Sequence, residues 1–182
     1  MNADTGQVLL PIARASIASA LGRPHTAPED AHWLRAPGAC FITLRQGERL
    51  RGCIGTLRAH RPLLDDVKAN ALAAAFRDPR FKPLLIDELE LTQVEVSLLS
   101  PLEALSFAHE QDALSQLRPQ VDGIVFEYGH HQSTFLPQVW EDLPQPDDFL
   151  AQLKYKAGLP PDFWDLEVKL TRYTVSKWSE GP

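Results

Sequence analysis

Cysteine is scarce in this sequence. Only Cys40 and Cys53 occur among its 182 residues, and they match neither CxxC spacing nor a disulfide framework. Two isolated cysteines suit a reducing compartment, so we expect a cytoplasmic protein. Long apolar runs are also missing, because none approaches the roughly 20 residues that a membrane span needs. The apolar stretch 8–21 is interrupted by Arg14 and follows no basic segment, which favours a helix over a signal peptide.

Basic residues are in the minority. The chain has 18 Lys and Arg against 24 Asp and Glu, a formal net charge of -6. Nucleic-acid binders usually carry a basic stripe that displaces counterions from phosphates, and none is visible here. Nucleic acid is therefore an unfavoured partner. The chain also lacks the GxGxxG, P-loop, GxSxG and HExxH patterns, so the common nucleotide, hydrolase and zinc-protease sites are not indicated.

What is present is typical of a globular protein. Hydrophobic residues make up 44% and charged residues 23% of the chain. Periodicity and turn signals predict helices over 7–21, 62–76, 109–117 and 146–157, hairpins over 40–57 and 121–136, and strands over 91–99 and 168–175. Hairpins and separated helices, without regular βαβ alternation, predict an α+β fold with antiparallel pairing. We expect a single domain over 1–182.

The segment LRGCIG is the most distinctive local feature. On the second strand of the first hairpin, Arg51, Cys53 and Gly55 share one face, because side chains alternate along a strand. Gly52 and Gly55 remove side chains beside the sulfur, which lets a ligand approach, and Arg51 is a cation that favours the thiolate. Yet cysteine often behaves as a small buried hydrophobe, and strand glycines often mark tight packing. The segment alone leaves both interpretations open.

Three further polar residues are candidate ligand contacts. Asp78 and Arg80 lie in a turn after a helix, where Arg80 can bind an anion with two parallel hydrogen bonds. The alternative is that Asp78 caps the turn and pairs locally. Glu95 lies within the strand 91–99 and is expected either on the solvent face or paired with an arginine such as Arg51.

Metal binding is not predicted. His130 and His131 are adjacent, and adjacent side chains on a strand point to opposite faces, so the pair is poorly placed to chelate. No Cys or carboxylate stands at metal-site spacing. The large aromatic residues Trp140, Trp164 and Trp178 are expected to pack in the core rather than to hold a cofactor.

Four ordered blocks of the chain resemble the AMMECR domain family, called AmmeMemoRadiSam system protein A in prokaryotes. They are GACFITLRQGERLRGCIGTL, AFRDPRFKPL, VEVSLLS, and TFLPQVWEDLP followed by KAGLPPDFW, and they span nearly the whole chain. The resemblance implies an α+β fold with two unequal subdomains, each with an antiparallel sheet, and with the terminal regions joined in the larger one. It also implies that LRGCIG lies at or near a groove between them.

The resemblance leaves two functions open, because it brings no established reaction. It implies a genetic association with a Memo-like protein, related in fold to non-haem iron dioxygenases, and with a radical SAM protein. One hypothesis is a small-molecule enzyme or accessory catalytic subunit in which Cys53 and Arg51 are catalytic. The residues expected to contact its ligand are Gly52, Gly55, Asp78, Arg80 and Glu95. The other hypothesis is a non-catalytic adaptor for the Memo-like and radical SAM proteins. Neither hypothesis names a cofactor or an oligomeric state.

Overall fold

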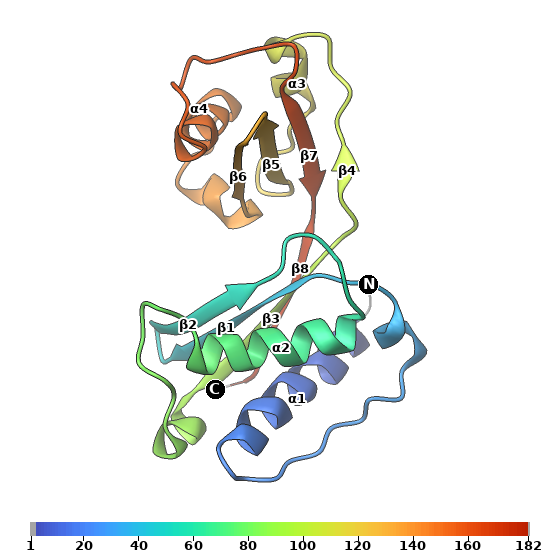
Figure 1. The fold of residues 1–182 in the computed structure, drawn as a ribbon, viewed down its shortest axis with the longest axis vertical. Helices are drawn as coiled ribbons and strands as arrows, with labels where there is room; N and C mark the ends of the chain where they lie inside the picture. The colour runs from blue at the N-terminus through green and yellow to red at the C-terminus, as the bar shows by residue number, and fades with distance from the viewer. Residues whose placement is uncertain (1–2, 182) are drawn as a thin grey trace. The chain divides into compact units, whose positions relative to one another are not determined.

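The computed structural model describes residues 3–181, which form two compact units. The first unit comprises Met1–Leu99 and Ser176–Pro182, and the second comprises Ser100–Val175. Each unit has its own four-stranded sheet and its own apolar core (Figure 1). Strand pairs are antiparallel in both sheets, and helices accompany each sheet, so the α+β prediction is confirmed.

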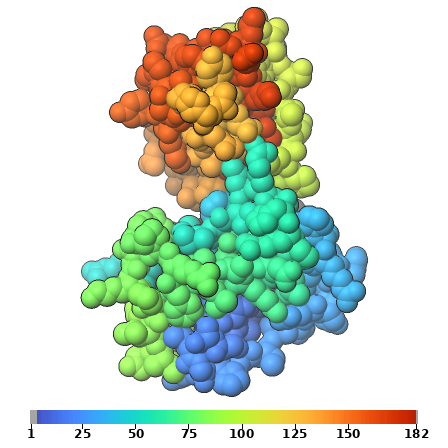
Figure 2. All heavy atoms as spheres, in the orientation of Figure 1, coloured from blue at the N-terminus to red at the C-terminus, as the bar shows by residue number. Residues whose placement is uncertain are grey.

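The first unit combines two long helices with one sheet. Its elements are α1 (Ala3–Ala20), the short 3-10 helix η1 (His32–Arg35), β1 (Cys40–Gln46), β2 (Arg49–Gly55), α2 (Leu63–Phe76), the 3-10 helix η2 (Ile86–Leu91), β3 (Gln93–Leu99) and β8 (Val175–Ser179). The strand order is β2-β1-β3-β8, so β2 and β8 form the two edges. Figure 2 shows that α2 and the segment after it, both in green, make up much of this unit's surface on the side turned to the viewer.

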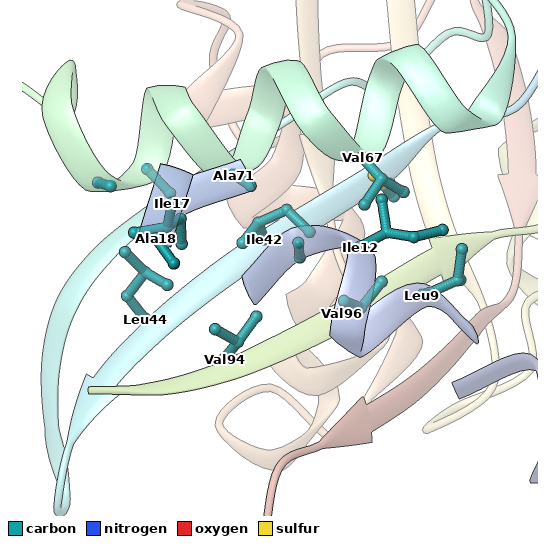
Figure 3. Packing of buried hydrophobic residues seen from close by; sticks show 14 of the residues in the cluster. Leu9, Ile12, Ile17, Ala18, Ile42, Leu44, Val67, Ala71, Val94 and Val96 are labelled. Carbon is teal, nitrogen blue, oxygen red and sulfur yellow. The ribbon is translucent and has the colours of Figure 1, made fainter. Parts of the chain in front are cut away.

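Both long helices pack on one face of this sheet. Ile42 of β1 and Val94 and Val96 of β3 are fully buried against them, as Figure 3 shows. From α1, Ile12 contributes to the same cluster, and Val67 does so from α2. Full burial of such a side chain contributes about 1.5–3 kcal/mol, so the predicted alternation along 91–99 defines the core face of β3.

The first hairpin turns through Gly47 and Glu48, as its sequence predicts. Gly47 has a φ of 59°, a left-handed conformation that glycine adopts without strain. The register then shifts next to Leu44: Leu44 pairs with Gly52, but the next residue of β1 pairs with Leu50. Arg51 is therefore the extra residue of a bulge, and the strict alternation expected for LRGCIG ends there.

The second unit has shorter elements around an aromatic centre. They are β4 (Glu103–Ala104), α3 (Glu110–Gln116), β5 (Gly123–Tyr128), β6 (His131–Phe135), the 3-10 helix η3 (Pro137–Glu141), α4 (Pro146–Lys156) and β7 (Lys169–Tyr173), with the strand order β4-β7-β5-β6. Trp140 is fully buried, stacks on Phe149 at 3.7 Å between ring centroids, and donates Nε1–H to the Asp122 carbonyl. The prediction that Trp140 packs in the core is confirmed.

The end of the chain differs from its prediction. The single strand expected over 168–175 is replaced by β7 and β8, which belong to different sheets. The segment 175–179 alternates weakly because it contains two serines and a lysine, so its strand character depends on pairing within the sheet. Within residues 3–181, no helix has the length and apolarity to cross a membrane.

Candidate functional site

The glycines of LRGCIG provide close packing. A Cβ atom on Gly52 would lie 2.2 Å from the Ala74 carbonyl oxygen, so β2 approaches the backbone of α2 directly. A Cβ atom on Gly55 would lie 2.2 Å from the Phe41 ring. The space expected beside the sulfur is therefore filled by the chain itself, and that part of the prediction is wrong. A ligand contact by either glycine stays a prediction.

Cys53 points away from the two helices. Its neighbour Gly52 faces α2 and Ile54 packs on the core, so alternation sends the half-buried Cys53 side chain to the opposite face of the sheet. Thr43 is its partner across β1, and the Thr43 hydroxyl donates a hydrogen bond of 3.3 Å to Cys53 Sγ. The sulfur thus meets a polar group rather than the apolar core.

The turn after α2 covers the free edge of β2 at Cys53. Asp78 Oδ2 accepts the Cys53 N–H at 2.9 Å, and Arg80 Nη2 donates to the Cys53 carbonyl oxygen at 3.1 Å. Because β2 is an edge strand, these bonds satisfy backbone groups that another chain would otherwise pair with. They also fix Arg80 at the Cys53 backbone.

Asp78 and Arg80 form a strong local pair. Arg80 Nε and Nη2 donate to the two Asp78 oxygens at 2.9 and 2.7 Å. These hydrogen bonds, together with backbone N–H donors, outweigh burial and hold the pKa of Asp78 well below its usual range. The pKa of Arg80 is raised, chiefly by Asp78, with a smaller contribution from the Cys53 side chain. The Asp78 side chain is 1% exposed and that of Arg80 54%, so the local-pairing interpretation holds while Arg80 still faces solvent.

Arg51 has a different partner from the one predicted. Its Nε and Nη2 each donate to a Glu88 oxygen at 2.9 Å, and Nη1 donates to the Lys82 carbonyl. The Arg51 hydrogen bonds, opposed by burial, lower the pKa of Glu88 to about 2. Arg51 therefore holds η2 against the hairpin, and the arginine that bonds to Cys53 is Arg80, through the Cys53 carbonyl oxygen. Sequence reasoning missed this because the bulge displaces Arg51 and because Arg80 lies 27 residues away from Cys53.

Glu95 is neither on the solvent face nor paired with Arg51. It is buried, and it accepts hydrogen bonds from Arg45 Nε at 2.8 Å and from Ser179 Oγ at 2.9 Å, with Lys177 Nζ at 2.8 Å. Burial raises its pKa, but the hydrogen bonds from Lys177, Arg45 and Ser179 together outweigh burial, so the net shift is downward. The expected solvent placement was wrong, whereas the expected pairing with an arginine is confirmed, with Arg45 in place of Arg51.

One row of residues crosses the sheet at the site. Cys53 of β2 pairs with Thr43 of β1, which pairs with Glu95 of β3. Two strand spacings put the Cα atoms of Cys53 and Glu95 about 10 Å apart. The row offers a thiol, a hydroxyl and an ion-paired carboxylate, with Arg80 at its end. The sequence signal for Thr43 was its place opposite Cys53 in the hairpin register.

The two adjacent histidines differ from their prediction. His130 lies in the hairpin turn and only His131 begins β6, so the two rings lie 4.2 Å apart instead of on opposite faces. His131 Nδ1 lies 2.8 Å from the Ala157 carbonyl oxygen, at the end of α4. Among residues 3–181, no group of three or more His, Cys, Asp or Glu side chains is arranged to hold a metal ion.

Comparison with known proteins identifies the family. The AMMECR1 family model matches residues 10–178. A protein of Methanothermobacter thermautotrophicus is 36% identical over 99% of this chain and 96% of its own, and a protein of Methanocaldococcus jannaschii is 38% identical over 78% and 72%. The crystal structure of an uncharacterized protein from Pyrococcus horikoshii has a TM-score of 0.84 and 31% identity, covering 99% of this chain and 93% of that one. The resemblance predicted from the four sequence blocks is confirmed, and the chain belongs to the AMMECR1 family.

Proposed function

We propose that this protein is a small-molecule enzyme or accessory catalytic subunit whose ligand binds at Cys53 and Arg80. In this role Cys53 is the nucleophile or direct ligand contact, and the ligand carries an anionic group that Arg80 binds. The observation that carries the proposal is a half-buried thiol that accepts from the Thr43 hydroxyl, on a residue whose backbone carbonyl accepts from the Arg80 guanidinium. A cysteine nucleophile needs an accessible sulfur, and the Cys53 side chain lies on the sheet face away from the two helices.

The Arg80 guanidinium has hydrogen-bond donors left with which to bind an anion. Arg80 Nε and Nη2 are occupied by Asp78 and the Cys53 carbonyl, whereas Nη1 takes part in none of those hydrogen bonds. More than half of the side chain is exposed, although its carboxylate partner is buried. A guanidinium held rigidly in this way loses little entropy when it binds a carboxylate or phosphate. The anion would then lie next to the thiol.

The ligand's origin follows from the family resemblance. We propose that the protein acts together with a Memo-like protein and a radical SAM protein, so that the small molecule is one they produce or consume. The groove between the two subdomains stays a prediction. Arg51 has no direct part in this proposal, since its guanidinium is engaged with Glu88.

The first test compares the two cysteines by alkylation. Iodoacetamide modification, followed by mass spectrometry across a pH series, should label Cys53 quickly. Cys40 should stay unlabelled in the folded protein, because it is fully buried and burial raises the pKa of its thiol. An Arg80→Met variant should slow Cys53 labelling, and Arg80→Lys should restore part of the rate. Labelling of Cys53 only after unfolding would remove the basis for a reactive thiol.

A non-catalytic adaptor is the second candidate, and exposed apolar side chains favour it. Leu85, Ile86 and Leu91 on or beside η2 are exposed although they are large and apolar. Such groups on a surface often mark contact sites for other proteins. A Leu85→Ser, Leu91→Ser double variant should then lose co-purification with the Memo-like or radical SAM protein while keeping its Cys53 labelling rate. If the unmodified proteins do not associate in any cofactor state, the adaptor role fails.

A further inference from the structure

A hollow in the second unit is independent of the Cys53 site. It has a volume of about 530 Å³ and lies among α3, α4 and the segment 161–164. Its lining includes Glu110, Asp147, Lys154, Asp162 and Trp164. Small-molecule sites are commonly hollows of about 300–1,000 Å³. Three of the lining residues come from the block KAGLPPDFW, which the Cys53 site does not use.

Lys154 is the unusual residue of this hollow. Its side chain is 3% exposed, and its Nζ lies 2.7 Å from Oε1 of Glu110, which is 34% exposed. An ammonium group has three N–H donors. Within residues 3–181, Glu110 is the one hydrogen-bond acceptor of Lys154 Nζ. Burial of a charged group is costly unless its donors are satisfied, so the remaining donors point to a further acceptor in the hollow.

The rim of the hollow has the opposite charge. Asp147 and Asp162 are exposed, and neither forms an ion pair with another described residue. Trp164 lines the hollow and packs against the core, with its ring 5.6 Å from that of Phe107. A tryptophan face binds both aliphatic stems and cations. The hollow thus combines a buried cation, exposed carboxylates and an aromatic wall.

Neither a simple anion nor a simple cation fits this combination. An anion at Lys154 would be repelled by Glu110, Asp147 and Asp162, while a cation at the rim would leave the donors of Lys154 unused. A ligand with both charges satisfies both ends. We propose that the hollow binds a free basic amino acid, with its carboxylate at Lys154, its side-chain cation at Asp147 and Asp162, and its aliphatic stem along Trp164.

The test uses three related compounds on the full chain. L-Arginine carries both charges, agmatine lacks the carboxylate, and L-citrulline lacks the side-chain cation. Isothermal titration should give a dissociation constant below about 1 mM for L-arginine. Agmatine and citrulline should each bind about tenfold more weakly, because each loses one charged hydrogen-bonded contact. Equal affinity for the three compounds, or no saturable binding of L-arginine, would overturn the proposal.

Variants separate this site from general electrostatics. Lys154→Met keeps the length of the side chain and should weaken L-arginine binding at least about tenfold, with agmatine unaffected. Lys156→Met is the matched control, because Lys156 lies on the same helix outside the hollow, and it should leave binding unchanged. If Lys154→Met fails to fold, L-arginine binding is measured in Asp162→Asn instead, because Asp162 is exposed and should tolerate the change. This variant should also bind L-arginine more weakly. Unchanged L-arginine binding in Asp162→Asn would contradict the proposed orientation.

Discussion

The two units of this protein have sheets of equal strand number but very different charge. Residues 1–99 and 176–182 contain 13 basic and 12 acidic side chains, whereas residues 100–175 contain 5 basic and 12 acidic ones. The formal charges are therefore +1 and -7. Arginine pairs with buried or half-buried carboxylates occur in both units, as in Arg80–Asp78 and Arg118–Asp122, but in the first unit Arg80 also bonds to the backbone of a half-buried cysteine. In the second unit, many carboxylates are left exposed, and the buried cation is a lysine.

This difference indicates distinct ligand chemistry. In the first unit Asp78 fixes Arg80, whose side chain still faces solvent next to the Cys53 carbonyl. The second unit has too few cations to neutralise its acidic residues, so its unpaired carboxylates can bind positively charged groups. The net charge of -6 for the whole chain does not reveal this difference in charge between the two units. The argument from composition against nucleic acid applies to the second unit more strongly than to the first.

Removal of Trp140 should have the largest effect and should show whether each core is independent. Trp140→Ala deletes the ring stacked on Phe149 and leaves the Asp122 carbonyl without its indole donor. We expect a loss of about 4 kcal/mol. Hydrogen exchange should show lost protection within 100–175. If hydrogen-exchange protection within 3–99 falls equally, the two cores unfold as one cooperative unit. Their stabilities could then not be compared separately.

Overpacking of β2 should have the next largest effect, confined to the first unit. Gly52→Ala places a methyl group against the Ala74 carbonyl oxygen, which is backbone and cannot rotate away. The cost should be about 2 kcal/mol in chemical denaturation. Gly181→Ala is the control, because a Cβ atom there meets nothing within 4 Å. Equal stability of the two variants would show that β2 can move away from α2.

Acid should weaken the first unit through the Arg51–Glu88 pair. The pKa of Glu88 is about 2 in the folded protein, against 4.5 for an ordinary glutamate. A depressed folded pKa means that the pair stabilises the protein above pH 4.5 and that this stabilisation is lost as the pH falls towards 2. Glu88→Gln should therefore be less stable than the parent at pH 7 and should show a flatter decline between these values. An unchanged pH profile would mean that the hydrogen bonds to Arg51 do not persist in solution.

Local pattern predicted the elements of the site but not its contacts. The hairpin and its turn follow from alternation and from Gly47, because these are properties of neighbouring residues, whereas alternation alone did not say which face of the sheet Cys53 occupies. The approach of Ala74 to Gly52 and the pairing of Arg80 with Cys53 depend on segments more than 20 residues apart, and the bulge at Arg51 breaks the strict alternation within the hairpin itself. The same holds for β8, whose sequence has no strong strand pattern and which adopts strand structure at the edge of an existing sheet.

The smallest predicted effect concerns Thr43, and it tests whether the Cys53 environment is specific. Thr43→Val keeps the shape of the side chain but removes the hydroxyl that donates to Cys53 Sγ. One such hydrogen bond contributes about 0.5–1 kcal/mol, so Cys53 alkylation should slow by about twofold to fivefold. Ser97→Ala is the control, since Ser97 lies on the same face of the sheet opposite Phe41. Equal slowing in both variants would point to a general loss of polarity on this face. No slowing in Thr43→Val would show that the Thr43 hydroxyl does not affect the reactivity of the thiol.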